Sequence, residues 1–260
     1  MSFDDIKREV AIGNRVLSHI GLCAGVDLAR GHVSLRVPDE PDKFVVKGRG
    51  YEVDVMPVMK AKDMVVCDLD GNKVEGPPEA TQCWEVKIHS AIYKNYPNVR
   101  SVIHVHPRHT VLMSILGATL VPMCREGHSL LSQPLPVWPH FKLVTSDQDG
   151  EEVAALMARS KVALLFGHGV VATGSTISES VVKVYELEEQ AKMNYMALNA
   201  MGMDFPRIPQ ELLEESREAP EFWELPHFQS SFPPDTTEDL HPSIDEGPYK
   251  YWASLVEEDV

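Results

Sequence analysis

The spacing of apolar residues divides the first part of the chain into one helix and two strands. Apolar side chains recur at helical spacing over residues 3–23, and Ser2 or Asp4 can cap that helix. After a turn-rich stretch, apolar and polar positions alternate over residues 32–37, and a second apolar run at 44–46 ends in a glycine-rich turn. The pattern therefore predicts a helix followed by two strands.

A hairpin and a helix are predicted next. Residues 64–69 form an apolar run that ends in Asp70-Gly71, a dipeptide typical of β-hairpin turns, and the partner strand follows at 73–74. Thr81 can cap the helix that comes after this hairpin.

Short apolar strands recur later in the chain. Residues 101–106 form a buried strand, and Pro107 suits the first turn of the helix that follows it. Residues 162–166 form another strand, whose hairpin partner we expect at 170–172. Thr176 begins a capping-box sequence, which predicts the start of a long helix.

The character of the chain changes beyond Met203. Prolines recur there, and acidic residues outnumber basic ones. We therefore predict a metal-binding domain over residues 1–203 and a proline-rich acidic tail over 204–260. Because the tail also contains aromatic residues, we expect it to pack on the domain or on a neighbouring subunit. These aromatic residues are Phe222, Trp223, Phe228, Tyr249, Tyr251 and Trp252.

Composition is that of an acidic globular protein. Of the 260 residues, 43% are hydrophobic and 24% are charged, and the formal net charge is −15. This charge argues against nucleic acid or an anionic membrane surface as a partner. No apolar run approaches the roughly 18 residues of a membrane span, and the first residues lack the layout of a signal peptide. The four cysteines have no metal-binding spacing. We therefore expect a cytoplasmic protein with reduced thiols.

Three histidines are the first candidates for chemistry. His104 and His106 are two residues apart on a predicted strand, so their side chains share one face. Neutral imidazole is a ligand for zinc, iron, manganese or cobalt, although buried strand histidines are often only hydrogen-bonded. His168 follows an apolar strand and lies between two glycines, which permit a sharp turn or a close approach. Alone it suits an exposed turn; together with the histidine pair it indicates one divalent metal site.

Glu85 is a candidate acid/base residue. It lies in the first turn of the predicted helix before the histidine strand, where a carboxylate gains from the helix dipole. The alternative is a role beside the metal, as general acid/base or as a fourth ligand. His89, one turn later on the same face, either positions Glu85 or packs in the core.

The sequence resembles the class II aldolase/adducin family over roughly residues 5–200. The order and spacing of four motifs carry this resemblance. They are Gly31-His32-Val33-Ser34, Glu85, His104-Val105-His106-Pro107 and Gly167-His168-Gly169.

The resemblance implies a fold, an assembly and a site. The fold would be an α/β protein with three α/β/α layers and a central, mainly antiparallel sheet. The assembly would be a homotetramer with active sites between subunits. His104, His106 and His168 would hold one divalent ion, zinc by family, with manganese, iron or cobalt as alternatives. Glu85 would be the acid/base residue.

The sequence departs from the sugar-phosphate aldolases of this family at three places. Those enzymes bind phosphate with small polar residues, usually Gly-Asn, Ser-Gly and Ser-Ser. This sequence has Gly31-His32, Lys47-Gly48-Arg49-Gly50 and Thr81-Gln82 instead. A sugar-phosphate substrate is therefore not expected.

The departures favour a small anionic substrate. Lys47 and Arg49 are cations in a glycine-rich turn, and in an acidic protein they favour an anionic group such as a carboxylate. Solvated loop cations are the alternative. Ser34, Arg125 and His128 are further candidates for the substrate pocket.

The pattern is more similar to the family branch that includes hydroxyaromatic carboxylate decarboxylases. This implies a metal-dependent decarboxylase in which Glu85 or His32 delivers the proton. An aldolase for a non-phosphorylated keto substrate would share the metal chemistry. A non-haem iron oxygenase would use two histidines and Glu85 as ligands. The fourth alternative is a non-enzymatic adducin-like scaffold, which would not need the three histidines and Glu85.

Overall fold

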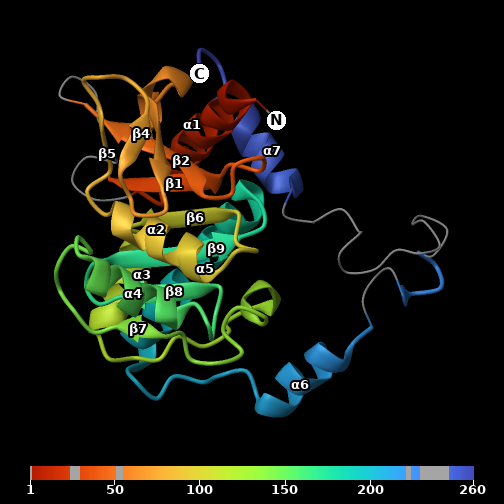
Figure 1. Ribbon diagram of the computed structural model, residues 1–260. Coiled ribbons are helices and arrows are strands. Elements are labelled where there is room, and N and C mark those ends of the chain that lie inside the picture. Colours follow the sequence, from red (N-terminus) through yellow and green to blue (C-terminus); the bar gives the residue numbers. More distant parts are fainter. Residues whose placement is uncertain (1, 24–29, 51–54, 221–223, 229–245) are drawn as a thin grey trace.

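One sheet forms the centre of the protein. The computed structural model describes residues 2–23, 30–50, 55–220, 224–228 and 246–260 (Figure 1). Within these residues nine strands join in the order β4-β3-β2-β1-β6-β9-β8-β7, and β5 pairs with β2. All neighbouring strands are antiparallel except β7 and β8. The strands are β1 (Gly31–Arg36), β2 (Lys43–Arg49), β3 (Met64–Asp68), β4 (Lys73–Glu75), β5 (Thr81–Gln82), β6 (Ser101–Val105), β7 (Val137–Trp138), β8 (Val162–Leu165) and β9 (Gly169–Gly174).

Helices cover both faces of this sheet. Side chains of α1, α3 and α5 pack with one set of alternating strand residues, such as Val33 and Ile103. Side chains of α2 and α4 pack with the other set, such as Phe44 and Val102. This arrangement confirms the three-layer α/β/α fold with a mainly antiparallel sheet. The helices are α1 (Phe3–His19), α2 (Val86–Asn95), α3 (Arg108–Ile115), α4 (Asp147–Leu156), α5 (Ile177–Met201), α6 (Gln210–Glu218) and α7 (Glu246–Ser254).

Local signals set several of these boundaries. Ser2 caps α1 in a capping box with Asp5, and the Thr176 side chain accepts a hydrogen bond from the Glu179 backbone at the start of α5. The expectation that Thr81 caps the next helix is wrong. Thr81 lies in β5, where its backbone pairs with that of Arg49, and α2 begins only after Glu85.

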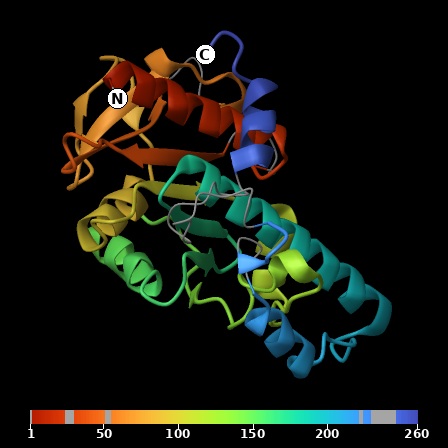
Figure 2. The same cartoon turned by 90° about the vertical axis from the view of Figure 1, so that its right-hand side faces the viewer.

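The segment after α5 contains α6 and α7. No residue of α6 is buried, and this helix extends from the body of the protein (Figure 1). By contrast, α7 lies beside α1 and α5 (Figure 2), and Tyr249 and Trp252 pack against their core. Phe222 and Trp223 are outside the described residues. The division at residue 203 stays a prediction.

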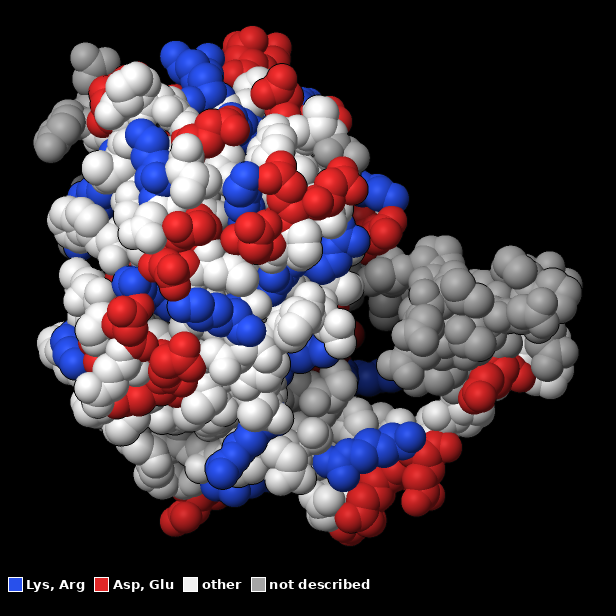
Figure 3. Space-filling view, viewed as in Figure 1, with Lys and Arg blue, Asp and Glu red and all other residues white. Residues whose placement is uncertain are grey.

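The surface carries both kinds of charge. Acidic and basic side chains are interspersed over the face shown in Figure 3. No described helix is both long enough and apolar enough to cross a membrane. All four cysteines are free thiols, and Cys23, Cys67 and Cys83 are buried.

Candidate metal centre

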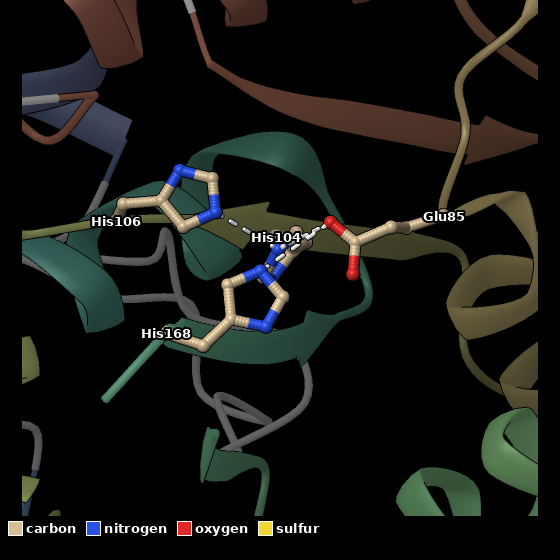
Figure 4. Close-up of side chains that lie close together, drawn as sticks. All are labelled: Glu85, His104, His106 and His168. Atoms are coloured by element: carbon tan, nitrogen blue, oxygen red, sulfur yellow. Dashed lines mark hydrogen bonds and ion pairs between the residues drawn. The ribbon is translucent and has the colours of Figure 1, made fainter. Parts of the chain in front are cut away.

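Four predicted site residues converge beside the end of β6. His104 is in this strand and His106 directly follows it, while His168 is in the turn between β8 and β9. Glu85 is the residue at the N-cap of α2. The four side chains point toward one another (Figure 4), and each offers a ligand atom within 4.8 Å of those of the others.

The spacing of these atoms suits a single metal ion. Nε2 of His104 is 3.2 Å from Nε2 of His106 and 3.2 Å from Oε2 of Glu85. Nε2 of His168 is 3.5 Å from the same oxygen. Two ligands about 2.0–2.1 Å from a tetrahedral zinc ion are separated by roughly 3.3–3.4 Å. The observed separations are therefore close to the edges of a coordination tetrahedron.

Glycine permits this close approach of the two histidine segments. A Cβ at Gly169 would lie only 2.5 Å from the carbonyl oxygen of Val105 and 2.8 Å from Cδ2 of His106. Gly167 has φ +61°, a value that favours glycine in the turn that presents His168. The glycines around His168 are thus explained by geometry, as the sequence pattern suggested.

Hydrogen bonds orient the imidazole rings. Nδ1 of His104 is 3.0 Å from the carbonyl oxygen of Val170. Because a carbonyl can only accept, the proton of neutral His104 is on Nδ1, and Nε2 keeps its lone pair for a metal. The His106 ring donates to the backbone carbonyl of Arg30. Nδ1 of His168 is buried and has no hydrogen-bond partner among the described residues.

Charge favours the same conclusion. Burial, together with the neighbouring His104 and His168, lowers the pKa of His106 to about 3, so this imidazole is neutral at pH 7. Burial raises the pKa of Glu85, but His104 and His168 together lower it by a larger amount, so the net shift is downward. The carboxylate is therefore ionised. An ionised carboxylate beside the neutral imidazole of His106 fits a divalent cation.

A backbone amide fixes the other oxygen of Glu85. The N–H of Val144 donates to Oε1 at 2.9 Å. Val144 is fully buried in the segment between β7 and α4. This contact leaves Oε2 directed at the histidines. Sequence patterns gave no sign of it, because it joins two segments far apart in the chain.

A second polar group lies behind the metal cluster. His32 is the cross-strand partner of His104, and the two ring centroids are 5.3 Å apart. Nδ1 of His32 is 2.6 Å from Nε2 of His89, and Nδ1 of His89 is 2.7 Å from Oγ of Ser34. Oγ of Ser34 is 2.8 Å from the hydroxyl of Tyr93. Ser34 is therefore hydrogen-bonded within the interior, behind His89, and not directed at the metal cluster.

This second group also contains three potential metal ligands. His32, Cys83 and His89 have ligand atoms within 4.8 Å of one another. However, the 2.6 Å between the nitrogens of His32 and His89 is too short for two ligands of one tetrahedral ion, which would be roughly 3.3 Å apart. It is a hydrogen-bond distance. We therefore assign this group to hydrogen bonding.

Two cations lie close to the site. Lys47 in β2 is only 5% exposed, and its charge is among the influences that lower the pKa of His32, after burial and the neighbouring histidines. The Arg49 guanidinium lies 3.4 Å from the ring centroid of Trp84, the residue next to Glu85. Trp84 is 58% exposed. Arg49 therefore lies on the residue that precedes Glu85, and Lys47 is buried near enough to His32 for its charge to act on that ring.

Arg125 and His128 lie elsewhere. Arg125 begins the short 3-10 segment Arg125–Gly127 that packs on α5, and His128 directly follows this segment. Arg125 is exposed. Nε2 of His128 is 2.9 Å from the carbonyl oxygen of Leu213 in α6. Among the described contacts of this chain, none joins either residue to the four-residue cluster.

Comparison with known proteins shows which proteins the chain is similar to. The pattern of the Class II Aldolase and Adducin N-terminal domain matches residues 8–195. A 3,4-dihydroxyphthalate decarboxylase from Arthrobacter keyseri is 27% identical over 205 residues, which cover 75% of this chain and 80% of that protein. An enzyme of the same name from Terrabacter sp. (strain DBF63) is 28% identical over 201 residues, covering 74% of this chain and 81% of that protein.

A solved structure supports the fold. The L-fuculose 1-phosphate aldolase from Glaciozyma antarctica has a TM-score of 0.74 with this protein, at 20% sequence identity. The match covers 98% of this chain and 91% of that one. The similarity to decarboxylases confirms the family branch that the sequence pattern indicated, and the aldolase shows the same fold.

Proposed function

Because the chain belongs to the class II aldolase/adducin family, we propose that it is a metal-dependent carbon–carbon lyase that decarboxylates a hydroxyaromatic or related carboxylic acid. The observation that carries this proposal is the convergence of three imidazole Nε2 atoms and one carboxylate oxygen. The names of the similar decarboxylases support the reaction type.

His104, His106 and His168 would hold the metal. Zinc suits three imidazoles, and manganese, iron and cobalt are alternatives. When bound, a divalent ion supplies Lewis-acid stabilisation of the negative charge that develops as a carbon–carbon bond breaks. Nε2 of His168 faces the shared centre, so its ring proton would be on Nδ1.

Glu85 would handle the proton. Decarboxylation exchanges a carboxylate for a proton at the same carbon, so the site needs a group that can carry one. Oε2 of Glu85 faces the histidines while Oε1 is held by the Val144 amide. Since the carboxylate is ionised at rest, it would first take a proton on Oε2, from a substrate hydroxyl or water, and then deliver it to the carbon.

Lys47 and Arg49 would bind a carboxylate that stays on the substrate. The substrate named for the similar decarboxylases is a dihydroxyphthalate, which has two carboxylates on one aromatic ring. Loss of one leaves the other in need of a counter-charge throughout the reaction. A buried ammonium at Lys47 and a guanidinium held on Trp84 would provide it.

The test is a product assay. Protein reconstituted separately with zinc, manganese, iron or cobalt would be incubated with dihydroxyphthalates and hydroxybenzoates, with Glu85→Gln as the matched control. We expect carbon dioxide release that depends on metal and on Glu85. Release of an aldehyde from hydroxy-keto acids would favour an aldolase, and iron-dependent oxygen uptake an oxygenase. Stoichiometric metal without any of these products from the panels would refute the proposal.

We also propose that the protein is a homo-oligomer, with a tetramer as the expected state. An exposed apolar group next to the site supports a subunit contact. Phe141 is 79% exposed, and both it and Ile115 border Gly167. Light scattering would measure the assembly, and Phe141→Ser would be expected to weaken it. A monomer at micromolar concentration would contradict this proposal.

A further inference from the structure

A line of hydrogen bonds ends at a backbone carbonyl. It runs from His32 through His89 and Ser34 to Tyr93, and the Tyr93 hydroxyl donates to the carbonyl oxygen of Arg100 at 3.1 Å. All four side chains are more than nine-tenths buried. Each link between them is 2.6–2.8 Å long, so each requires one proton.

The carbonyl at the end favours one direction for every link. A carbonyl cannot donate, so the single hydroxyl proton of Tyr93 is committed to Arg100. The proton between Ser34 and Tyr93 then comes from Ser34, for which Tyr93 at 2.8 Å is a nearer acceptor than the Val102 carbonyl at 3.5 Å. Ser34 in turn accepts from Nδ1 of His89. In the reverse direction, the Tyr93 and Arg100 oxygens would face each other at 3.1 Å with no proton between them. Because the Arg100 carbonyl also accepts from the Arg36 N–H at 2.8 Å, the cost is the repulsion of two buried oxygens and not an unsatisfied carbonyl.

Following the protons along the hydrogen bonds also assigns the ring proton of His32. His89 is fully buried and its two ring nitrogens face His32 and Ser34, not a carboxylate. It is therefore neutral with one ring proton, in line with the burial that lowers its pKa to about 3. That proton is on Nδ1, which leaves Nε2 of His89 as an acceptor. The proton between the two rings therefore belongs to Nδ1 of His32.

We propose that His89, Ser34 and Tyr93 are positioning residues that hold neutral His32 with its proton on Nδ1. His32 then presents a bare Nε2 on the side of the sheet where His104 lies. It enters the reaction as a hydrogen-bond acceptor for a substrate hydroxyl, not as a donor. The acceptor role rests on the proposed function, whereas the fixed tautomer does not.

Nitrogen NMR of the histidine rings tests the tautomer directly. Long-range proton–nitrogen correlations in the zinc-loaded, ¹⁵N-histidine-labelled full chain distinguish Nδ1–H from Nε2–H, and loss of a signal in His32→Gln assigns the resonance. We expect a single Nδ1–H form in the unmodified protein. In Tyr93→Phe and Ser34→Ala the ratio of the two tautomers should fall by roughly five- to ten-fold, as for loss of one buried hydrogen bond.

Two controls match these variants. Tyr96→Phe removes another hydroxyl at the end of α2, one that donates to the carbonyl of Ala154 at 2.9 Å. Ser180→Ala removes a buried hydroxyl of α5 that lies outside the chain of hydrogen bonds. Neither should change the tautomer ratio. An Nε2–H or cationic His32 in the unmodified protein would overturn the proposal, as would equal ratios in the variants and controls.

Kinetics test the acceptor role. If only the Nδ1–H form binds substrate, KM should rise in inverse proportion to the fraction of that form, with kcat unchanged. A KM that does not follow the tautomer fraction overturns the acceptor role and leaves the tautomer assignment standing. If the protein shows no lyase activity, the proposed function fails, but the NMR result still decides whether the positioning residues hold His32.

Discussion

Two groups of histidines lie beside the neighbouring strands β1 and β6 and have opposite arrangements. In the metal cluster, the ring nitrogens of His104 and His106 are 3.2 Å apart and both also face other ligand atoms. In the second group, His32 and His89 are 2.6 Å apart in an unbranched line. The ligand atoms of the metal cluster surround one position that an ion could occupy. The second group is a chain of hydrogen bonds that runs from His32 to the carbonyl of Arg100.

The difference lies in where the protons are. The Val170 carbonyl takes the one ring proton of His104, so that its Nε2 offers a lone pair toward His106. Such lone pairs are compatible with a cation between them. Every link of the second group holds a proton instead. Residue type alone does not distinguish a ligand from a hydrogen-bonded histidine, but distance and proton count do.

The largest expected effect is loss of a ligand. His106→Ala should abolish stoichiometric metal binding and lower kcat/KM by roughly 10³-fold or more, because Lewis-acid stabilisation is worth several kcal/mol. Metal analysis and the product assay would measure both. His140→Ala is the control, since that ring packs on Trp138 outside both groups. Full metal content in His106→Ala would contradict the cluster.

The Glu85→Gln variant distinguishes a role of Glu85 as a metal ligand from its role as the acid/base residue. Gln can still accept from the Val144 amide, so the fold and the metal should be retained. The loss of proton transfer should lower kcat by about 10²–10⁴-fold. Loss of the metal in this variant would instead identify Glu85 as an essential fourth ligand, and the cluster would then be a four-ligand site.

Metal removal should destabilise the protein. A metal present at about 100 times its Kd adds roughly 2.7 kcal/mol to the free energy of unfolding. For a chain of this size, that corresponds to a fall in Tm of about 5–10 °C on treatment with a chelator. Calorimetry would show it, and restored metal should reverse it. His106→Ala should show no chelator effect.

The second group should respond differently. His89→Leu leaves His32 and Ser34 without their shared partner in the interior, at a cost of about 1–3 kcal/mol in the free energy of unfolding. It should keep its metal. Denaturant unfolding and metal analysis would test this, with His89→Gln as the milder variant that retains an acceptor. Metal loss in both variants would mean that the two groups are not separate.

The smallest expected effect concerns neither group. Arg49→Ala should raise KM about ten-fold, as for loss of one charge-assisted hydrogen bond, with kcat and metal content nearly unchanged. Arg49→Lys should restore part of this, because it keeps the charge but not the planar stack on Trp84. Steady-state kinetics decide the point. An unchanged KM would show that Arg49 does not bind substrate.

The three histidines of the metal cluster could be predicted from the sequence because the patterns that indicate them are local. Strand alternation places His104 and His106 on one face. An apolar run ending at Gly167 places His168 at a strand end. The fold class and the strands around these residues followed from the same short-range patterns and from the family resemblance.

The second group was not accessible, because it depends on contacts across the sheet. Whether His89 packs or positions another residue depends on its distances from His32 and Ser34, which no spacing in the chain encodes. The same holds for Val144 and Glu85. The start of α2 was wrongly predicted because threonine is a common N-cap residue. In the structure, the Thr81 backbone pairs with Arg49 in a short strand instead.

The position of β6 means that the metal cluster can form only after strands from distant parts of the chain have paired. This strand pairs with β1 on one side and β9 on the other, and these come from the early and late parts of the chain. A chain emerging from the ribosome up to α4 contains His104 and His106 but has not yet synthesised His168. The complete ligand set exists only when β9 has joined the sheet. Tight metal retention would therefore mark molecules whose two halves have assembled, and separate them from those stalled before closure.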